Sequence, residues 1–135
     1  MGKTCQTIAL LAYIYEKNPR LLHLIVVPAS TLENWSRELS QWFPDFNFHV
    51  YMGSPDERLA QRKEILKGLN NKKSRNPLNA ILTTYSYVSF NKHDQAFFRS
   101  IGFEYVVYDE AHVLKNMKSL KYENLMKIKV RFKFL

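Results

Sequence analysis

The sequence predicts an α/β fold built on a parallel sheet, and two observations support this prediction. Short, nearly continuous apolar runs recur along the chain, and such runs are typical of strands that are covered on both faces. Stretches with helical spacing of apolar residues lie between these runs. That alternation implies parallel strands joined by right-handed helical crossovers, with helices on both faces of the sheet.

The first half of the chain supplies two helices and two strands. Apolar residues recur with helical spacing over 4–18, and the run ends at a proline. Residues 22–27 form a buried strand that is stopped by the next proline, and 30–43 is again helical. Residues 48–51 alternate between apolar and polar side chains, which indicates a second strand.

Two serines are predicted to start helices through a capping box. In this motif the serine hydroxyl accepts from the amide three residues on, and a glutamate there reaches back to the cap. Ser30 with Glu33 and Ser54 with Glu57 have this spacing. Pro55 strengthens the second signal, because proline suits the first helical position.

The second half repeats the alternation. A basic helix is expected from Ser54 to about residue 68, and 70–77 is polar and without periodicity, as in a loop. Strands are predicted at 80–84 and 105–108, with a helix at about 94–101 between them.

Two tryptophans lie in the predicted helix at 30–43. Trp35 and Trp42 fall on one side of this helix together with Leu32 and Leu39. An apolar stripe at helical spacing is the face that packs against a sheet. Both tryptophans are therefore predicted to lie in the core.

Length and composition restrict the class of protein. The 135 residues are about right for a single domain spanning 1–135. No apolar run reaches the roughly 18 residues of a membrane helix, and no signal-peptide pattern is present, so we expect no membrane association. The single cysteine excludes an internal disulfide and a cysteine-based metal site.

Positive charge is concentrated in two segments of a chain whose net charge is +8. Residues 58–75 and 115–135 each hold seven basic residues against one acidic residue. Such clusters suit a polyanion, because each neutralised phosphate releases a counterion. Nucleic acid is the expected partner, and an exposed helix face plus a solvated loop is the alternative for either segment alone.

Two short motifs point to nucleotide chemistry. Gly2-Lys3-Thr4 leads into a helix, and Asp109-Glu110 ends an apolar strand. A triphosphatase needs a lysine for the outer phosphates, a hydroxyl and a carboxylate for Mg²⁺, and an acid that orients or deprotonates water. Lys3, Thr4, Asp109 and Glu110 match these roles in that order, so ATP and Mg²⁺ are the predicted cofactors.

Four segments follow one another along the chain in a recognisable order. They are Gly2-Lys3-Thr4, Val27-Pro28-Ala29-Ser30 with Trp35 and Glu38, Leu82-Thr83-Thr84-Tyr85, and Asp109-Glu110-Ala111-His112 with Leu114-Lys115-Asn116. Each segment alone is a weak signal, whereas their order and spacing together strongly resemble the Swi/Snf family of chromatin-remodelling ATPases, which are helicase-like P-loop NTPases. By resemblance, the first segment is motif I, the second is motif Ia, and the last is motif II with its tail. Asn116-Met117, Tyr122 and Leu125-Met126 look closest to the Etl/SMARCAD branch.

The resemblance implies the first of two RecA-like lobes in a nuclear ATP-dependent DNA translocase. Its implied partners are duplex DNA or nucleosomes and a second RecA-like lobe. By resemblance, His112 couples the nucleotide site to the facing lobe, and Gly2 belongs to the phosphate loop. Ser30, Thr83 and Thr84 would face the DNA backbone, where hydroxyls position without reading sequence.

Both ends of the chain depart from the family pattern. We expect a partial lobe that lacks the phosphate-loop strand and the strand after motif II, with the second lobe missing as well. The strand ending at Asp109 would then expose an unpaired edge, which favours aggregation. The chain alone is expected to be inactive as an ATP hydrolase.

Two other functions remain open from the sequence. One is a non-catalytic binding module that keeps the basic surface without turnover. The other is a lobe of a DEAH-box RNA helicase, which shares the acidic tetrad at 109–112. The segment from Pro28 to Trp35 argues against the second.

Overall fold

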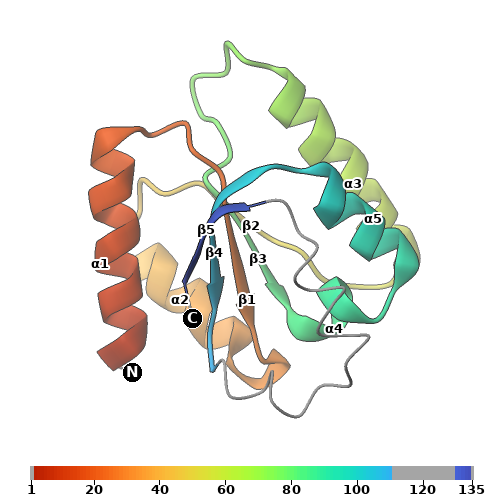
Figure 1. Cartoon of the computed structure of the whole chain (residues 1–135), viewed down its shortest axis with the longest axis horizontal. Coiled ribbons are helices and arrows are strands. Elements are labelled where there is room, and N and C mark those ends of the chain that lie inside the picture. The colour runs from red at the N-terminus through yellow and green to blue at the C-terminus, as the bar shows by residue number, and fades with distance from the viewer. Residues whose placement is uncertain (1, 111–129, 135) are drawn as a thin grey trace.

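A computed structural model describes residues 2–110 and 130–134, and within them the chain forms a five-stranded, all-parallel sheet (Figure 1). The strand order is β2-β3-β1-β4-β5. The strands are β1 (His23–Val27), β2 (Phe48–Val50), β3 (Ala80–Thr84), β4 (Phe103–Tyr108) and β5 (Val130–Phe134). The predicted α/β class and parallel sheet are confirmed.

Helices cover both faces of this sheet, α1 and α2 on one side and α3 to α5 on the other (Figure 1). Their bounds are α1 (Gly2–Lys17), α2 (Leu32–Trp42), α3 (Pro55–Asn70), α4 (Tyr85–Ser89) and α5 (Lys92–Ser100), with a 3₁₀ turn η1 (Ala29–Thr31) before α2.

Two apolar cores result, because successive residues of β1 point to opposite faces. Ile25 and Val27 pack with residues of α1 and α2, whereas Leu24 and Val26 pack with the aromatic residues of α4 and α5. All of β1 is buried, as expected for a central strand of a sheet that is covered on both faces.

The strand after motif II was predicted to be missing, and this prediction is wrong. β5 pairs in parallel with β4, with Phe103 opposite Val130 and Val107 opposite Phe134. Alternating apolar residues at 130, 132 and 134 suit a strand. The edge of β4 is therefore occupied.

One of the two predicted capping boxes forms. At α3, Ser54 Oγ accepts from Glu57 N–H at 3.2 Å and Glu57 Oε1 accepts from Ser54 N–H at 3.1 Å. The box at Ser30 does not form, because the chain first makes the η1 turn and α2 is capped by Thr31 without a side-chain bond.

The structure also corrects the expectation for Trp42 and adds a short helix. Trp42 is the last residue of α2 and is 62% exposed, because the helix ends there and the stacked rings of Phe43 and Phe46 fill the core beside it. Helix α4 follows β3 directly and was not predicted. No helix of the described part is long and apolar enough to cross a membrane.

Candidate nucleotide and nucleic-acid site

Every motif that the structure describes lies at one edge of the sheet. Parallel strands end at a common edge, and open α/β sheets bind ligands there. Helix α1 precedes β1 by a short loop and runs antiparallel to it, so its N-terminal turn lies at the same edge (Figure 1). Gly2-Lys3-Thr4 and Asp109-Glu110 therefore share the carboxyl edge of the sheet.

The motif Gly2-Lys3-Thr4 forms the first turn of α1. The first N–H groups of a helix have no partner within it and face anions well. Thr4 is buried at 6% exposure. The side chain of Lys3 lies outside what the structure describes.

Asp109 is held by hydrogen bonds from three elements. The indole N–H of Trp35 on α2 donates to Asp109 Oδ2 at 2.8 Å. The hydroxyl of Tyr85 on α4 donates to the Asp109 carbonyl at 2.7 Å, and the Asp109 N–H donates to the carbonyl of Val26 on β1 at 2.8 Å. Its backbone and one carboxylate oxygen are thus fixed.

Glu110 has a backbone conformation that side chains rarely adopt. Its φ is 53°, in the left-handed region, and its side chain is exposed. A non-glycine residue pays roughly 1 to 2 kcal/mol for this region, and such strain is concentrated at functional sites. The turn separates the two acids, with Asp109 half-buried and Glu110 pointing to solvent.

These residues fit a Mg²⁺ ion that is shared with phosphate. Magnesium is usually held by one or two carboxylates, with water and phosphate oxygens completing the octahedron. Among the residues that the structure describes, Trp35 donates to Asp109 Oδ2 and no donor to Oδ1 is seen. Those residues include no cluster of three acidic, histidine or cysteine side chains that could hold a metal ion by themselves.

The surroundings of Tyr85 keep its hydroxyl protonated, so that it can donate to the Asp109 carbonyl. Burial raises the pKa of Tyr85, and the charges of Asp109 and Glu110 raise it further. The hydroxyl therefore stays protonated and remains a donor to Asp109 throughout the physiological range.

The three hydroxyl residues that the resemblance assigned to DNA differ in exposure. Ser30 is exposed in the η1 turn. Thr83 is fully buried and donates to the carbonyl of Tyr51 at 2.9 Å, so its hydroxyl holds β3 to the segment after β2. Thr84 is 4% exposed and shares a 2.9 Å hydrogen bond with Ser86. His112 lies outside the described residues.

The basic segment at 58–75 is split by the fold. Arg58 and Arg62 point inward and form ion pairs with Asp94 at 3.2 and 3.0 Å. Asp94 is fully buried, and it also accepts a hydrogen bond from Tyr51. Two of the seven basic side chains of this segment therefore stabilise the fold.

The other five basic residues of the segment are exposed: Lys63, Lys67, Lys72, Lys73 and Arg75. The last three lie in the loop that leads into β3, at the amino edge of the sheet. This edge is opposite the one that carries Asp109. Arg20 holds the loop in place by donating to the carbonyls of residues 72 and 74 at 2.6 and 3.0 Å. The second basic segment lies largely within 111–129, outside the described residues.

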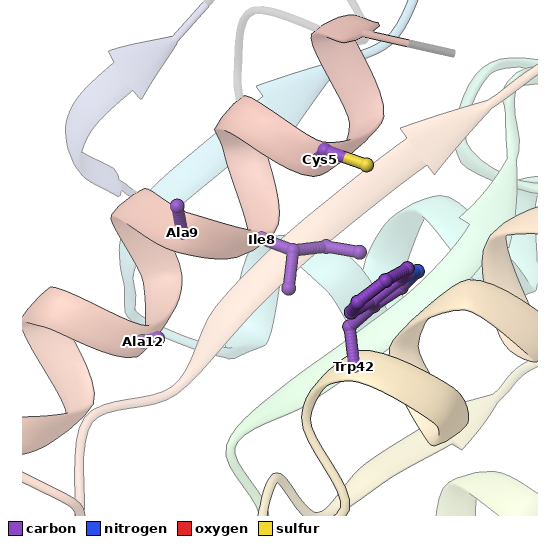
Figure 2. A pocket seen from close by; sticks show the side chains of 5 residues that line it. All are labelled: Cys5, Ile8, Ala9, Ala12 and Trp42. Atoms are coloured by element: carbon purple, nitrogen blue, oxygen red, sulfur yellow. The ribbon is translucent and has the colours of Figure 1, made fainter.

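A separate apolar pocket of about 290 Å³ lies between α1 and the exposed ring of Trp42 (Figure 2). Its lining is Cys5, Ile8, Ala9, Ala12 and Trp42. These described lining residues offer no cation or hydroxyl to a phosphate.

Sequence reasoning missed the two donors to Asp109. Trp35 was predicted to be a core residue, and at 1% exposure it is one, yet its indole N–H reaches the site. A buried tryptophan usually finds a partner for its N–H, which is the signal that could have revealed the contact.

Comparisons with known proteins agree with this geometry. The model of the SNF2-related domain matches residues 1–135. A zebrafish (Danio rerio) protein, the SWI/SNF-related matrix-associated actin-dependent regulator of chromatin subfamily A containing DEAD/H box 1A, is 44% identical over the whole chain. The yeast (Saccharomyces cerevisiae) ATP-dependent helicase FUN30 is 41% identical over the same 135 residues. The chain spans 13% of the first relative's length and 11% of the second's.

A solved structure is similar as well. The Sulfolobus solfataricus SWI2/SNF2 ATPase core in complex with dsDNA superimposes with a TM-score of 0.74 and 26% identity, over 98% of this chain and 24% of that one. The predicted partial RecA-like lobe and the predicted family are therefore confirmed. The chain belongs to the SNF2-related domain family, among relatives of the SMARCAD branch.

Proposed function

We propose that this chain forms most of the first ATP-binding lobe of a DNA-dependent ATPase that remodels chromatin. One observation supports this above all: a constrained Asp109 at the end of β4 shares the carboxyl edge with the helix that begins at Gly2-Lys3-Thr4. The known SNF2 relatives favour this reading over a DEAH-box RNA helicase.

Each motif residue has a role that its chemistry suits. Lys3 would contact the outer phosphates, and the amides of the first turn of α1, including that of Gly2, would complete the phosphate cradle. Thr4 and Asp109 would hold Mg²⁺, which neutralises phosphate charge when bound. Glu110 would orient the attacking water or accept its proton, and its exposed side chain can reach such a water.

Duplex DNA, free or in nucleosomes, is the proposed substrate, and the nucleus is the proposed location. Support comes from the likeness to an ATPase core solved with dsDNA and to relatives named as regulators of chromatin. Ser30 and Thr84 would lie near the DNA backbone, whereas the buried Thr83 can contribute only by positioning its neighbours. His112 would couple the nucleotide site to a second lobe.

The test is ATP turnover by the complete protein that contains these residues, with and without duplex DNA. The wild-type protein should hydrolyse ATP faster when DNA is present, and Lys3→Ala or Glu110→Gln should abolish turnover. Gln6→Ala, an exposed change in the same helix, should leave turnover unchanged. Normal turnover in the Lys3→Ala protein would contradict the assignment, and absence of turnover in the wild type would favour the non-catalytic module.

A further inference from the structure

Asp109 is held at two different atoms by two buried aromatic donors, and the proposed nucleotide chemistry does not by itself explain this. We propose that Trp35 and Tyr85 are positioning residues for the Mg²⁺ site. Trp35 sets the orientation of the Asp109 carboxylate, and Tyr85 fixes the peptide between Asp109 and Glu110. This inference rests on the proposed function, because it assumes that Asp109 binds Mg²⁺.

Trp35 is suited to orient a carboxylate. Its ring is 1% exposed in the core between α1, α2 and the sheet, so packing prevents the indole from turning. Its Nε1 atom lies 2.8 Å from Asp109 Oδ2 and donates to it. Hydrogen bonds to an ionised acceptor are about twice as strong as those between neutral groups. With Oδ2 engaged, Oδ1 is presented in one direction, so a metal ion meets a ligand that is already oriented.

Tyr85 acts on the backbone. Its hydroxyl donates at 2.7 Å to the Asp109 carbonyl, and its ring stacks against Tyr108 with 6.4 Å between centroids. The same peptide leads into Glu110, whose φ of 53° is disfavoured for a residue with a side chain. A fixed carbonyl holds this turn, which directs Asp109 toward the metal and Glu110 toward the water.

The two donors come from the two segments that are proposed to meet DNA. Trp35 lies on α2, directly after the η1 turn that carries Ser30, and Tyr85 immediately follows Thr84. A shift of either segment would therefore move a hydrogen-bond donor of Asp109. The arrangement gives DNA binding a physical route to the Mg²⁺ site.

The test uses Tyr85→Phe, which removes the hydroxyl donor and keeps the ring, and Trp35→Phe, which removes the indole donor and leaves a smaller aromatic ring. The turnover of ATP by the complete protein is measured against Mg²⁺ concentration, which separates half-saturating Mg²⁺ from the maximal rate. Supporting partners of metal ligands are typically worth about 10- to 100-fold in metal affinity or activity, so each variant should need at least about tenfold more Mg²⁺. A purely structural role would lower the maximal rate or the melting temperature without raising the Mg²⁺ requirement.

Matched controls are available on the surface. Trp42, at the end of the same helix, is 62% exposed, and Trp42→Phe removes its indole. Tyr13 on α1 is 58% exposed, and Tyr13→Phe removes its hydroxyl. Both should keep the wild-type Mg²⁺ requirement. If Trp35→Phe fails to fold, Tyr85→Phe alone decides the outcome.

A spectroscopic reading is independent of turnover. In protein with ¹⁵N-labelled tryptophan, the indole signal that disappears in Trp35→Phe should shift in Asp109→Asn and on addition of Mg²⁺ with a non-hydrolysable ATP analogue. The signal of Trp42 should stay in place. A Trp35 signal that is unchanged in both experiments would overturn the inference.

The two ideas fail in different ways. Wild-type turnover in Asp109→Asn would remove the proposed nucleotide site itself. An inactive Asp109→Asn beside Trp35→Phe and Tyr85→Phe proteins with a wild-type Mg²⁺ requirement would leave that site intact and overturn the positioning role.

Discussion

Arg58 on α3 joins both carboxylate oxygens of Asp94 on α5, with 3.2 Å from its Nε to each oxygen. Asp94 has no exposed surface, and the guanidinium of Arg58 also lies 4.6 Å from the ring centre of Tyr87. A buried charge is tolerated only with such partners, because its desolvation costs several kcal/mol. The pair therefore links two helices on one face of the sheet.

Breaking this pair should destabilise the fold. Arg58→Met removes the cation while keeping most of the apolar stem. It should lower the free energy of unfolding by about 1.5 to 3 kcal/mol, since Asp94 loses its hydrogen bonds from Arg58 but keeps the ion pair with Arg62. Denaturant unfolding followed by circular dichroism measures this. Lys63→Met on the exposed side of α3 is the control and should change stability by less than about 0.5 kcal/mol. Equal effects of the two changes would refute the structural role of Arg58.

Two glycines should respond to alanine in opposite directions. Gly53 has a φ of 120°, and a Cβ there would lie 3.2 Å from Glu57 Cβ, so Gly53→Ala should destabilise the fold by about 1 to 2 kcal/mol. Gly68 lies in α3 with nothing within 4 Å of an added Cβ. Gly68→Ala should therefore stabilise the fold by about 0.5 to 1 kcal/mol. Alanine has less conformational freedom than glycine in the unfolded chain, and it fits the helix without strain. Thermal melts of both variants check the sign, and a stabilising Gly53→Ala would be inconsistent with the described turn.

Stability should fall in mild acid because of His23. This residue is 2% exposed at the start of β1, its Nδ1 has no hydrogen-bond partner within the described part, and burial lowers its pKa to about 4. In the unfolded chain the pKa of this histidine is near 6.5. Between pH 6.5 and 4 the unfolded chain is therefore protonated at His23, whereas the folded chain is not. The stabilisation is complete above pH 6.5 and decreases, by up to about 3 kcal/mol, as the pH falls to 4.

Unfolding free energies measured across this pH range in wild type and His23→Leu test the prediction. The variant should show a flatter profile, because the titrating group is gone. His93→Leu, at an exposed position of α5, serves as the control and should keep the wild-type slope. A wild-type slope in His23→Leu would show that another group controls acid stability.

Salt dependence should separate the basic side chains that serve DNA from those that serve the fold. Binding of duplex DNA should weaken with salt with a slope of about −0.9 per phosphate contacted. Lys72 and Lys73 lie at the opposite edge of the sheet from Ser30 and Thr84, so they would contact a different stretch of the DNA. Replacing both by glutamine should make that slope less steep, because both are exposed. The matching change at Arg62, which is paired with Asp94, should leave the slope nearly unchanged. A slope that depends on Arg62 but not on the two lysines would refute this division.

Local patterns predicted the architecture because each strand and helix depends on its own residues. The runs at 22–27 and 80–84 and the cap at Ser54 needed no knowledge of distant contacts. The failures arose where tertiary contacts decide. The η1 turn displaced the predicted cap at Ser30, and β5 formed from a segment whose pairing with β4 could not be read locally.

The same distinction applies to the site. The sequence motifs were enough to predict roles for Asp109, Glu110 and Thr4, because those roles depend on residue type and position, and the roles stay predictions. The contact from Trp35 spans 74 residues of sequence, and the pairing of Arg58 with Asp94 spans 36, so neither leaves a local pattern. The basic residues at 58–75 could be counted from the sequence. The fold was needed to show that two of them pair with the buried Asp94 and that the other five are exposed.

The most direct test of the account is the affinity of the complete protein for a fluorescent ATP analogue. This affinity is measured with and without Mg²⁺ for the wild type and for Asp109→Asn. The asparagine keeps the shape of the side chain and removes the charge that would bind the metal. We predict that the wild type binds the nucleotide more tightly when Mg²⁺ is present, and that Asp109→Asn loses this gain while keeping its fold. Equal Mg²⁺-dependent binding in the two proteins would contradict the central claim that Asp109 holds the metal of a nucleotide site.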